Sequence, residues 1–333
     1  MATTLSEQSH LGAGQIRIDV LAPGALSPSE LNRWEEIQAA DPRYSSPFLT
    51  PAYTQIVGLS CEGVRVAVLR TSEHSIQGFF PFQLVSSRHA KSVGTNLCDY
   101  QAVIATDDLH FTAQGLLSGC GLDRWDFDHL LADQREFLEF HRIRDFSPIV
   151  DLSDGFEAYA RQMTQEKRYQ LAQSARRRRQ LEREVGPVVL SAHEPDPELL
   201  EELIAIKGAQ WARSGWPNRF ESPWERSLLK GIMEANQPGF GGMMTVLRAG
   251  GRVIALHLGM RSRTVWHYWI TAYDPAFGGY SPGLVMLVEM IRSASGLGLT
   301  SVDLGKGNLL YKRRLMNGAI QLAEGTVCAD APP

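Results

Sequence analysis

Hydrophobic and polar residues follow regular spacings along the first half of the chain. Alternating or continuous apolar runs predict strands, and apolar residues at every third or fourth position predict helices. Ser27-Pro28-Ser29-Glu30 indicates a helix start, because Ser27 and Glu30 can form a capping box and Pro28 fits the first turn. The predicted order is strand, helix, helix, three strands, helix and strand. The strands are Ile16–Val20, Val64–Arg70, Ile76–Val85, Gln101–Ala105 and Trp125–Leu130, with a turn at Thr71–Ser75; helices begin at Ser27 and after Pro51, and a third covers Leu109–Ser118.

The second half of the chain repeats this order after a long polar helix, Gly155–Val185, that connects the halves. Ser222-Pro223-Trp224-Glu225 repeats the capping-box signature, and Gly250-Gly251 supplies a hairpin turn. From Pro282 onward, apolar residues recur with the 3.6-residue period of a helix. The predicted strands are Val188–His193, Met243–Arg248, Arg252–Met260, Thr264–Thr271, Ser301–Leu304 and Ile320–Cys328; the other helices are Glu198–Arg213 and Ser222 to about Asn236.

The repeated order predicts two domains. A chain of 333 residues has room for two, at about 100–200 residues per domain. We place them at residues 15–147 and 148–330. The expected fold class is α+β, with mixed, mostly antiparallel sheets flanked by helices.

Composition excludes several classes of protein. With 44% hydrophobic and 21% charged residues the chain is close to the globular average, which argues against collagen-like and disordered chains. No apolar run reaches the roughly 18–20 residues that cross a bilayer, and Met1–Gln15 lacks the regions of a signal peptide. Cys61, Cys98, Cys120 and Cys328 form no CxxC pair, so neither a zinc ribbon nor a disulfide scaffold is indicated. We expect a cytoplasmic enzyme or binding protein.

Common catalytic motifs are also missing. The sequence has no P-loop and no HExxH motif, and Gly12-Ala13-Gly14 is preceded by no strand. The histidines show no metal-ligand spacing, so we expect no metal.

Two glycine-containing segments of the second half resemble a known family. They are Tyr273-Asp274-Pro275-Ala276-Phe277-Gly278-Gly279-Tyr280-Ser281-Pro282-Gly283 and Asp303-Leu304-Gly305-Lys306-Gly307-Asn308, followed by Tyr311-Lys312. Together with the element order, these motifs resemble GNAT N-acetyltransferases of the CelD type, named after a cellulose-biosynthesis protein. Fem peptidoglycan aminoacyltransferases are similar in their duplicated layout. The resemblance implies tandem GNAT folds, with a catalytic C-terminal domain and an N-terminal domain that is non-catalytic and lines the acceptor cleft.

The resemblance further implies an N-acyltransferase that uses acetyl-CoA or another acyl-CoA as co-substrate. The acyl group would pass directly to an amine, and the family suggests an amino sugar or another polysaccharide precursor. No covalent enzyme intermediate is expected.

A helix N-terminus suits the pyrophosphate of such a donor, because its unpaired N–H groups carry partial positive charge. Gly278, Gly279 and Gly283 would let the backbone approach, and Ser281, next to Tyr280, would cap the helix and donate its hydroxyl. The loop departs from the family's usual Arg/Gln-x-x-Gly-x-Gly/Ala signature. The alternative is an ordinary glycine-rich loop before a capped helix.

Acid and base candidates lie on the strands around the expected opening of the sheet. His257 shares a strand face with small residues that would leave room for a substrate, so it is a candidate base. Tyr268, on the same face as Trp266, could protonate the departing thiolate, and Asp274 could act as a base through a water. The alternatives are a hydrogen-bonded core histidine, a packed tyrosine and an Asp-Pro turn.

Two further residues follow the second motif. Asp303 ends a strand, and Lys312 could contact phosphate or the acceptor, or could pair with Asp303 as a structural ion pair. The resemblance places carbonyl-polarising backbone amides on Val265–Thr271, where this strand separates from Ser301–Leu304.

The connecting helix is strongly basic. Residues 166–183 contain seven Lys or Arg and two Glu, a charge of +5 in a chain of net charge −4. The run Arg176–Arg179 could bind a polyanion such as tRNA, although Arg178 and Glu182 also form a favourable i,i+4 pair. Two rival functions follow: a Fem-like transferase that uses aminoacyl-tRNA, and a non-catalytic exopolysaccharide-assembly protein.

Overall fold

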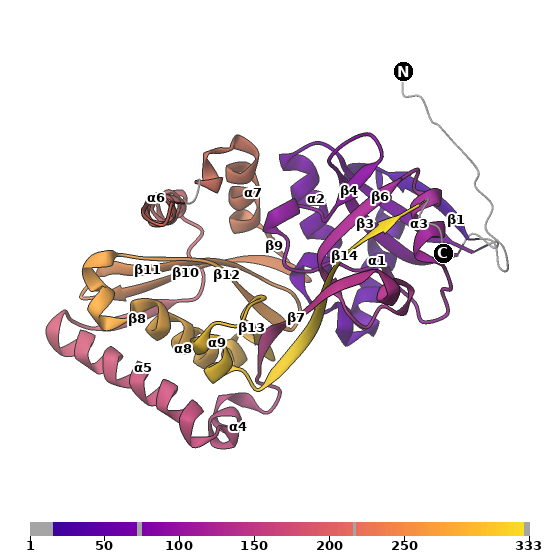
Figure 1. The fold of residues 1–333 in the computed structure, drawn as a ribbon. Helices are drawn as coiled ribbons and strands as arrows, with labels where there is room; N and C mark the ends of the chain where they lie inside the picture. Colours follow the sequence, from indigo (N-terminus) through magenta and orange to yellow (C-terminus); the bar gives the residue numbers. More distant parts are fainter. Residues whose placement is uncertain (1–15, 72–74, 216–217, 330–333) are drawn as a thin grey trace. The chain divides into compact units, whose positions relative to one another are not determined.

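The computed structural model describes residues 16–71, 75–215 and 218–329 (Figure 1). They group into two compact units, one formed by the described residues up to 146 with 321–329, and the other by those between 147 and 320. The sequence places the division one residue later and assigns 321–330 to the second domain. The structure instead groups the end of the chain with the first unit, because Leu322–Cys328 pairs with Arg124–Leu131.

The first unit is a mixed sheet with helices packed on it. Its strands run in the order β1, β2, β3, β4, β6 and β14, and neighbours are antiparallel except for the parallel pair β4 and β6. Phe80, Trp125 and Phe137 anchor its core. The elements are β1 Arg17–Leu21, β2 Val64–Arg70, β3 Ile76–Leu84, β4 His89–Lys91, β5 Ile104–Ala105, β6 Arg124–Leu131 and β14 Gly318–Cys328, with α1 Pro28–Ala40, α2 Pro51–Ser60 and α3 Ala113–Gly119.

The second unit has the same order of elements. Its strands run β7, β13, β12, β11, β10 and β8, and the pair β12 and β13 is parallel. Helices α6 and α7 lie on one face of this sheet, whereas α5, α8 and α9 lie on the other (Figure 1). The strands are β7 His141–Asp151, which continues into this unit, β8 Val188–Ser191, β9 Asn236–Gln237, β10 Phe240–Ala249, β11 Arg252–Arg261, β12 Val265–Tyr273 and β13 Ser301–Asp303. The helices are α4 Gly155–Gln162, α5 Gln165–Glu184, α6 Pro197–Arg213, α7 Pro223–Glu234, α8 Pro282–Ala294 and α9 Leu310–Leu315.

Several local signals are confirmed, whereas the capping box predicted at Ser222 does not form, since its side chain makes no capping hydrogen bond. Ser27 and Glu30 form both hydrogen bonds of the capping box at the start of α1. Gly250 and Gly251 have positive φ angles of 56° and 79° in the turn between β10 and β11, which glycine tolerates. Arg178 and Glu182 form the predicted i,i+4 ion pair at 2.8 Å.

Several predicted boundaries are wrong. The helix predicted over Gly155–Val185 is two helices, because the Thr164 hydroxyl accepts the Lys167 amide and starts α5 anew. The predicted strand Gln101–Ala105 shrinks to Ile104–Ala105, and Gln101 forms an isolated parallel bridge to Leu130 of β6. The helix predicted over Leu109–Ser118 begins only at Ala113, after its cap Thr112.

The sequence pattern did not predict several other elements, among them β4, β7 and β9. Of the predicted turn Thr71–Ser75, residues 72–74 lie outside the described part of the chain. None of the helices in the described ranges combines the length and the apolar character required to cross a membrane.

Candidate functional site

Strands β12 and β13 part near the middle of the second unit. They pair in parallel from Val265 and Ser301 to His267 and Asp303. Strand β12 then continues to Tyr273, whereas the chain after β13 turns away through Gly305, whose φ is +73°. The separation lies where the sequence analysis expected it.

The ladder between β11 and β12 is irregular at the same point. Leu258 pairs with Ile270 and Met260 pairs with His267, so Tyr268 and Trp269 together oppose Gly259 in a β-bulge. A Cβ atom on Gly259 would lie 2.3 Å from the His267 carbonyl oxygen and 2.4 Å from Cε1 of His257. Only glycine therefore fits opposite this bulge.

His257 is fully buried beneath the bulge, with both ring nitrogens engaged. Its Nε2 accepts the Trp269 amide at 3.1 Å, and its Nδ1 lies 3.1 Å from Oγ1 of Thr245. Burial lowers the pKa of His257 to about 3, and the nearby His267 contributes to this shift. The predicted space for a substrate beside His257 is wrong, because the ring itself fills the gap over Gly259.

Tyr268 and Trp266 both join the core cluster under α8, on one face of β12 as predicted. The Tyr268 ring stacks on His257 with centroids 4.9 Å apart and planes at 15°. Burial raises the pKa of Tyr268, and the nearby Tyr311 on α9 contributes to the rise. The phenol is therefore protonated at neutral pH. Trp266 is completely buried, so the structure gives it a packing role.

The sequence analysis used Tyr311 only as part of a motif. Tyr311 lies on α9 and packs against the core cluster that contains Tyr268 of β12. Tyr311 is half-buried against the same core cluster. The only sequence signal for its position is its place shortly after the second glycine motif.

A buried polar cluster holds the turn after β13. The Asp303 carboxylate accepts the Ser147 hydroxyl at 2.5 Å and the Gly305 amide at 2.9 Å, and lies 3.3 Å from Nδ1 of His267. Lys312 is also buried and donates from Nζ to the carbonyl oxygens of Gly305 at 3.0 Å and Lys306 at 3.1 Å. Asp303 and Lys312 thus both brace the turn at which the chain leaves β12.

The connection from β12 to α8 forms a short 3-10 helix, Pro275–Tyr280. The Asp274 carboxylate accepts the Ala276 amide at 2.9 Å and so starts this helix. Phe277 is buried beneath it, with the Arg252 guanidinium 4.8 Å from its ring centroid. Tyr280 donates its hydroxyl to Glu184 on α5 at 3.0 Å.

Helix α8 begins at Ser281 in the left-handed region, with φ 53° and ψ 54°. The predicted cap is wrong: the side chain of Ser281 makes no capping hydrogen bond, because this backbone conformation directs it elsewhere. Leu284 and Val285 donate to the Ser281 carbonyl, whereas the Gly283 amide finds no protein acceptor among the described residues. A Cβ atom on Gly279 or Gly283 would meet nothing within 4 Å. The first turn of α8 therefore presents a donor with open space beside it.

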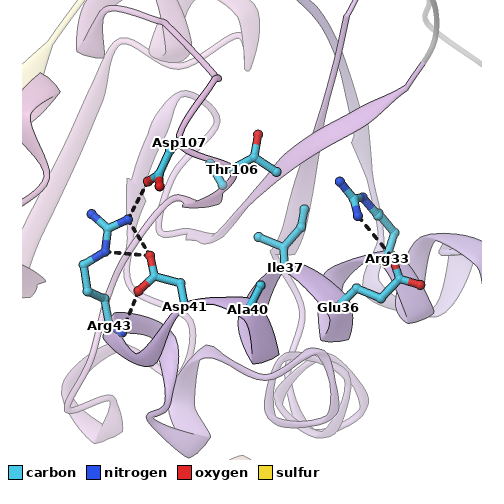
Figure 2. Close-up of a pocket in the computed structure, with 9 residues that line it drawn as sticks. Arg33, Glu36, Ile37, Ala40, Asp41, Arg43, Thr106 and Asp107 are labelled. Atoms are coloured by element: carbon cyan, nitrogen blue, oxygen red, sulfur yellow. Dashed lines mark hydrogen bonds and ion pairs between the residues drawn. The ribbon is translucent and has the colours of Figure 1, made fainter.

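The first unit contains a pocket of about 600 Å³ between α1, the turn that follows it and Ala105–Asp107 (Figure 2). Its charged side chains already pair with one another: Arg43 binds Asp41 and Asp107, and Arg33 binds Glu36. Little net attraction for a charged ligand remains there.

Two of three comparisons with known proteins bear on the fold, and they agree. Residues 166–313 match the family model described as Acetyltransferase (GNAT) domain. A search of curated proteins finds no match to the sequence.

Among solved structures, FemX aligns with a TM-score of 0.58 and 11% identity, covering 89% of this chain and 94% of its own. L-PGS from Bacillus licheniformis aligns with a TM-score of 0.52 and 13% identity, over 92% of this chain and 93% of its own. A tandem GNAT protein from the clavulanic acid biosynthesis pathway aligns with a TM-score of 0.51 and 12% identity, over 96% and 100%. The chain therefore has the tandem GNAT fold, and its residues 166–313 match the acetyltransferase domain family of that fold.

Proposed function

We propose that the second unit transfers an acyl group from acyl-CoA to the amino group of a small molecule or glycan precursor. The observation that carries this proposal is the open Gly283 amide at the start of α8, in the connection that directly follows the unpaired part of β12. A diphosphate at that amide would let the rest of the donor run along the edge of β12. The match of residues 166–313 to the acetyltransferase family supports the same reaction class.

The donor would bind through backbone groups. The open space over Gly279 and Gly283 admits a phosphate oxygen close to the main chain. Gly278, Tyr280 and Ser281 shape the loop, and the bond from Tyr280 to Glu184 ties it to α5. Because the loop lacks the Arg or Gln of the usual signature, backbone amides would bind the diphosphate in place of that side chain.

In the proposed step, the acceptor nitrogen attacks the thioester carbonyl carbon, a C–N bond forms and the C–S bond breaks. The amine proton passes to a base, and the leaving thiolate takes up a proton. Tyr268 is the proposed acid, since the raised pKa of its phenol keeps it protonated. With His257 fully buried, Asp274 is the proposed base, acting through a water with the carboxylate oxygen that does not bind Ala276. Lys312 and Asp303 are proposed to hold the turn beside the acceptor.

The acceptor class rests on the resemblance to CelD-type proteins, which suggests an amino sugar or polysaccharide precursor. We propose that the first unit is non-catalytic. Helix α3 of this unit has the same place in the order of elements as α8, and it supports the proposal. Its Gly115 amide donates to the Thr112 hydroxyl at 3.1 Å and is therefore not free to bind a diphosphate.

Helix α5 favours a second candidate, a Fem-like transferase that uses aminoacyl-tRNA. Arg176 and Arg179 are exposed and have no protein partner among the described residues, so they could contact phosphates. Arg178, in contrast, is engaged by Glu182 and by the Val188 carbonyl. The fold similarity to FemX is compatible with this candidate but does not distinguish it.

Calorimetric titration with acetyl-CoA, a long-chain acyl-CoA and bulk tRNA separates these functions. Saturable acyl-CoA binding, followed by release of free thiol in the presence of an amine panel, is the expected result. Tight tRNA binding that weakens steeply with salt, and is lost in the double variant Arg176→Ala and Arg179→Ala, would favour the second candidate. Absence of both would leave the non-catalytic assembly protein.

A further inference from the structure

We propose that His257 is a positioning residue, which as a neutral ring with its proton on Nδ1 clamps the β12 bulge and the Tyr268 ring. This inference rests on the proposed function, because it gives His257 a part in the same reaction. It replaces the role of base that the sequence suggested.

The tautomer follows from the hydrogen bonds. The Trp269 amide can only donate, so Nε2 of His257, 3.1 Å away, must accept and carries no proton. The proton of the neutral ring is then on Nδ1, which donates to Oγ1 of Thr245 at 3.1 Å. Thr245 in turn donates its hydroxyl to the Ala192 carbonyl at 3.1 Å. Three hydrogen bonds thus run in one direction, from β12 through β11 and β10 to the end of β8.

This chain of hydrogen bonds begins at the Trp269 amide of the bulge. An ordinary ladder hydrogen bond to the Trp269 amide is replaced by one to a side chain, which the bulge makes necessary. Protonation of His257 would place a second N–H against the Trp269 amide and break the clamp. The depressed pKa of His257, about 3, is in keeping with this geometry.

The same ring fixes the proposed acid. Tyr268 stacks on His257 nearly parallel, and Gly259 leaves just enough room for the imidazole beneath the bulge. Loss of the ring would release both the backbone at Trp269 and the side chain of Tyr268. A displacement of about 1 Å at a reacting group can cost about 10²-fold in rate.

The first test is nitrogen NMR of the protein labelled at histidine, with the His257 signals assigned from the spectrum of His257→Gln. At neutral pH the proposal predicts a neutral ring protonated at Nδ1. A ring protonated at Nε2, or a charged ring, would overturn it. This readout needs no substrate, so it stands even if acyl-CoA proves not to bind.

The second test compares His257→Gln with His257→Leu. Glutamine can accept the Trp269 amide in place of Nε2, whereas leucine cannot. For His257→Leu we expect at least tenfold faster hydrogen exchange at the Trp269 amide. We also expect a kcat about 10²-fold lower with little change in KM for the donor, and a shift in the alkaline limb of the pH profile. Glutamine should restore exchange protection and most of kcat.

Equal exchange and equal kcat in the two variants would contradict the clamp. If His257→Leu does not fold, Thr245→Val is the second variant, because it leaves the His257 ring in place and removes the acceptor of the Nδ1 proton together with the hydrogen bond from Thr245 to the Ala192 carbonyl. That variant should raise exchange at Trp269 severalfold, and unchanged exchange together with an unchanged tautomer would count against the proposal. Failure of turnover in the wild type, with the NMR and exchange results as expected, would refute the proposed function and leave the clamp intact.

Discussion

Helices α3 and α8 hold the same place in the two units, between the third strand of the antiparallel run and the parallel strand that follows, yet their first turns differ. Helix α3 has seven residues, and Thr112 binds its Gly115 amide through the side chain and its Leu116 amide through the carbonyl. Helix α8 has thirteen residues, starts from a left-handed Ser281 and has no side-chain cap. Two units with the same order of elements can therefore differ at the N-terminus of this helix. In one unit a side chain caps the first turn, and in the other an amide of the first turn can bind a ligand.

Strands β4 and β12, which precede these helices, also differ in how far they extend beyond their parallel partners. Strand β4 has three residues and pairs with β6 at His89 and Ala90. Strand β12 has nine residues and runs on past its pairing with β13, with a bulge where the pairing stops. A ligand needs both a free strand edge and a free helix start, and the second unit has them in one connection.

Blocking the open helix start should have the largest effect. Gly283→Glu puts bulk and negative charge beside the amide, and we expect at least 10³-fold weaker acyl-CoA binding by calorimetry, about 4 kcal/mol. Gly296→Glu, in the turn after the same helix and also with open space around it, is the matched control and should bind normally. Equal affinity of the two variants would remove the donor site from α8.

Acid should destabilise the second unit through His257. Between its ordinary value of 6.5 and its folded pKa of about 3, the unfolded chain binds a proton that the native state does not. Through His257 the free energy of unfolding therefore decreases by about 1.4 kcal/mol for each pH unit by which the pH falls through that window. Above pH 6.5 the residue makes no such contribution to the pH dependence. Denaturant unfolding from pH 7 to pH 4 should show a shallower pH dependence in His257→Gln. The same slope in both proteins would mean that His257 is charged in the native state.

Filling the space opposite the bulge should destabilise the fold. In Gly259→Ala the new methyl group meets the His267 carbonyl and the His257 ring, and we expect a loss of about 2 kcal/mol or more in free energy of unfolding. Gly296→Ala, which meets nothing, should change stability by less than about 0.5 kcal/mol. A tolerated Gly259→Ala would show that the bulge is not held tightly.

The two helix starts should respond oppositely to small changes. Thr112→Ala removes a capping hydrogen bond and should cost about 1 kcal/mol. Ser281→Gly removes no capping bond and relieves a left-handed backbone, so it should stabilise by about 0.5–1 kcal/mol. Thermal unfolding measures both, and a loss of stability in Ser281→Gly would show that the serine side chain supports the loop.

The sequence was sufficient for several local signals, although not for the caps predicted at Ser222 and Ser281. The capping box at Ser27, the Gly250-Gly251 turn and the apolar stripe of α8 each depend on residues a few positions apart, and the structure has all three. The family resemblance also led us to expect that Val265–Thr271 separates from Ser301–Leu304, and the two strands do part after His267 and Asp303.

The site depends on contacts that the local pattern cannot contain. The sequence pattern places His257 on a strand, on the same face as small residues. Only the register between β11 and β12 shows that Gly259 makes room for its ring. The left-handed start of α8 at Ser281 is equally invisible, because Ser-Pro-Gly is also a good capping sequence. Strand β7 was missed because its buried, half-buried and exposed residues do not alternate strictly.

Hydrogen–deuterium exchange with and without acyl-CoA measures the difference between the two helix starts most directly. We predict that the donor slows exchange at residues 278–285 and leaves residues 112–116 of the first unit unchanged. Protection at 112–116 instead, or at neither segment under saturating donor, would contradict the assignment of the donor site.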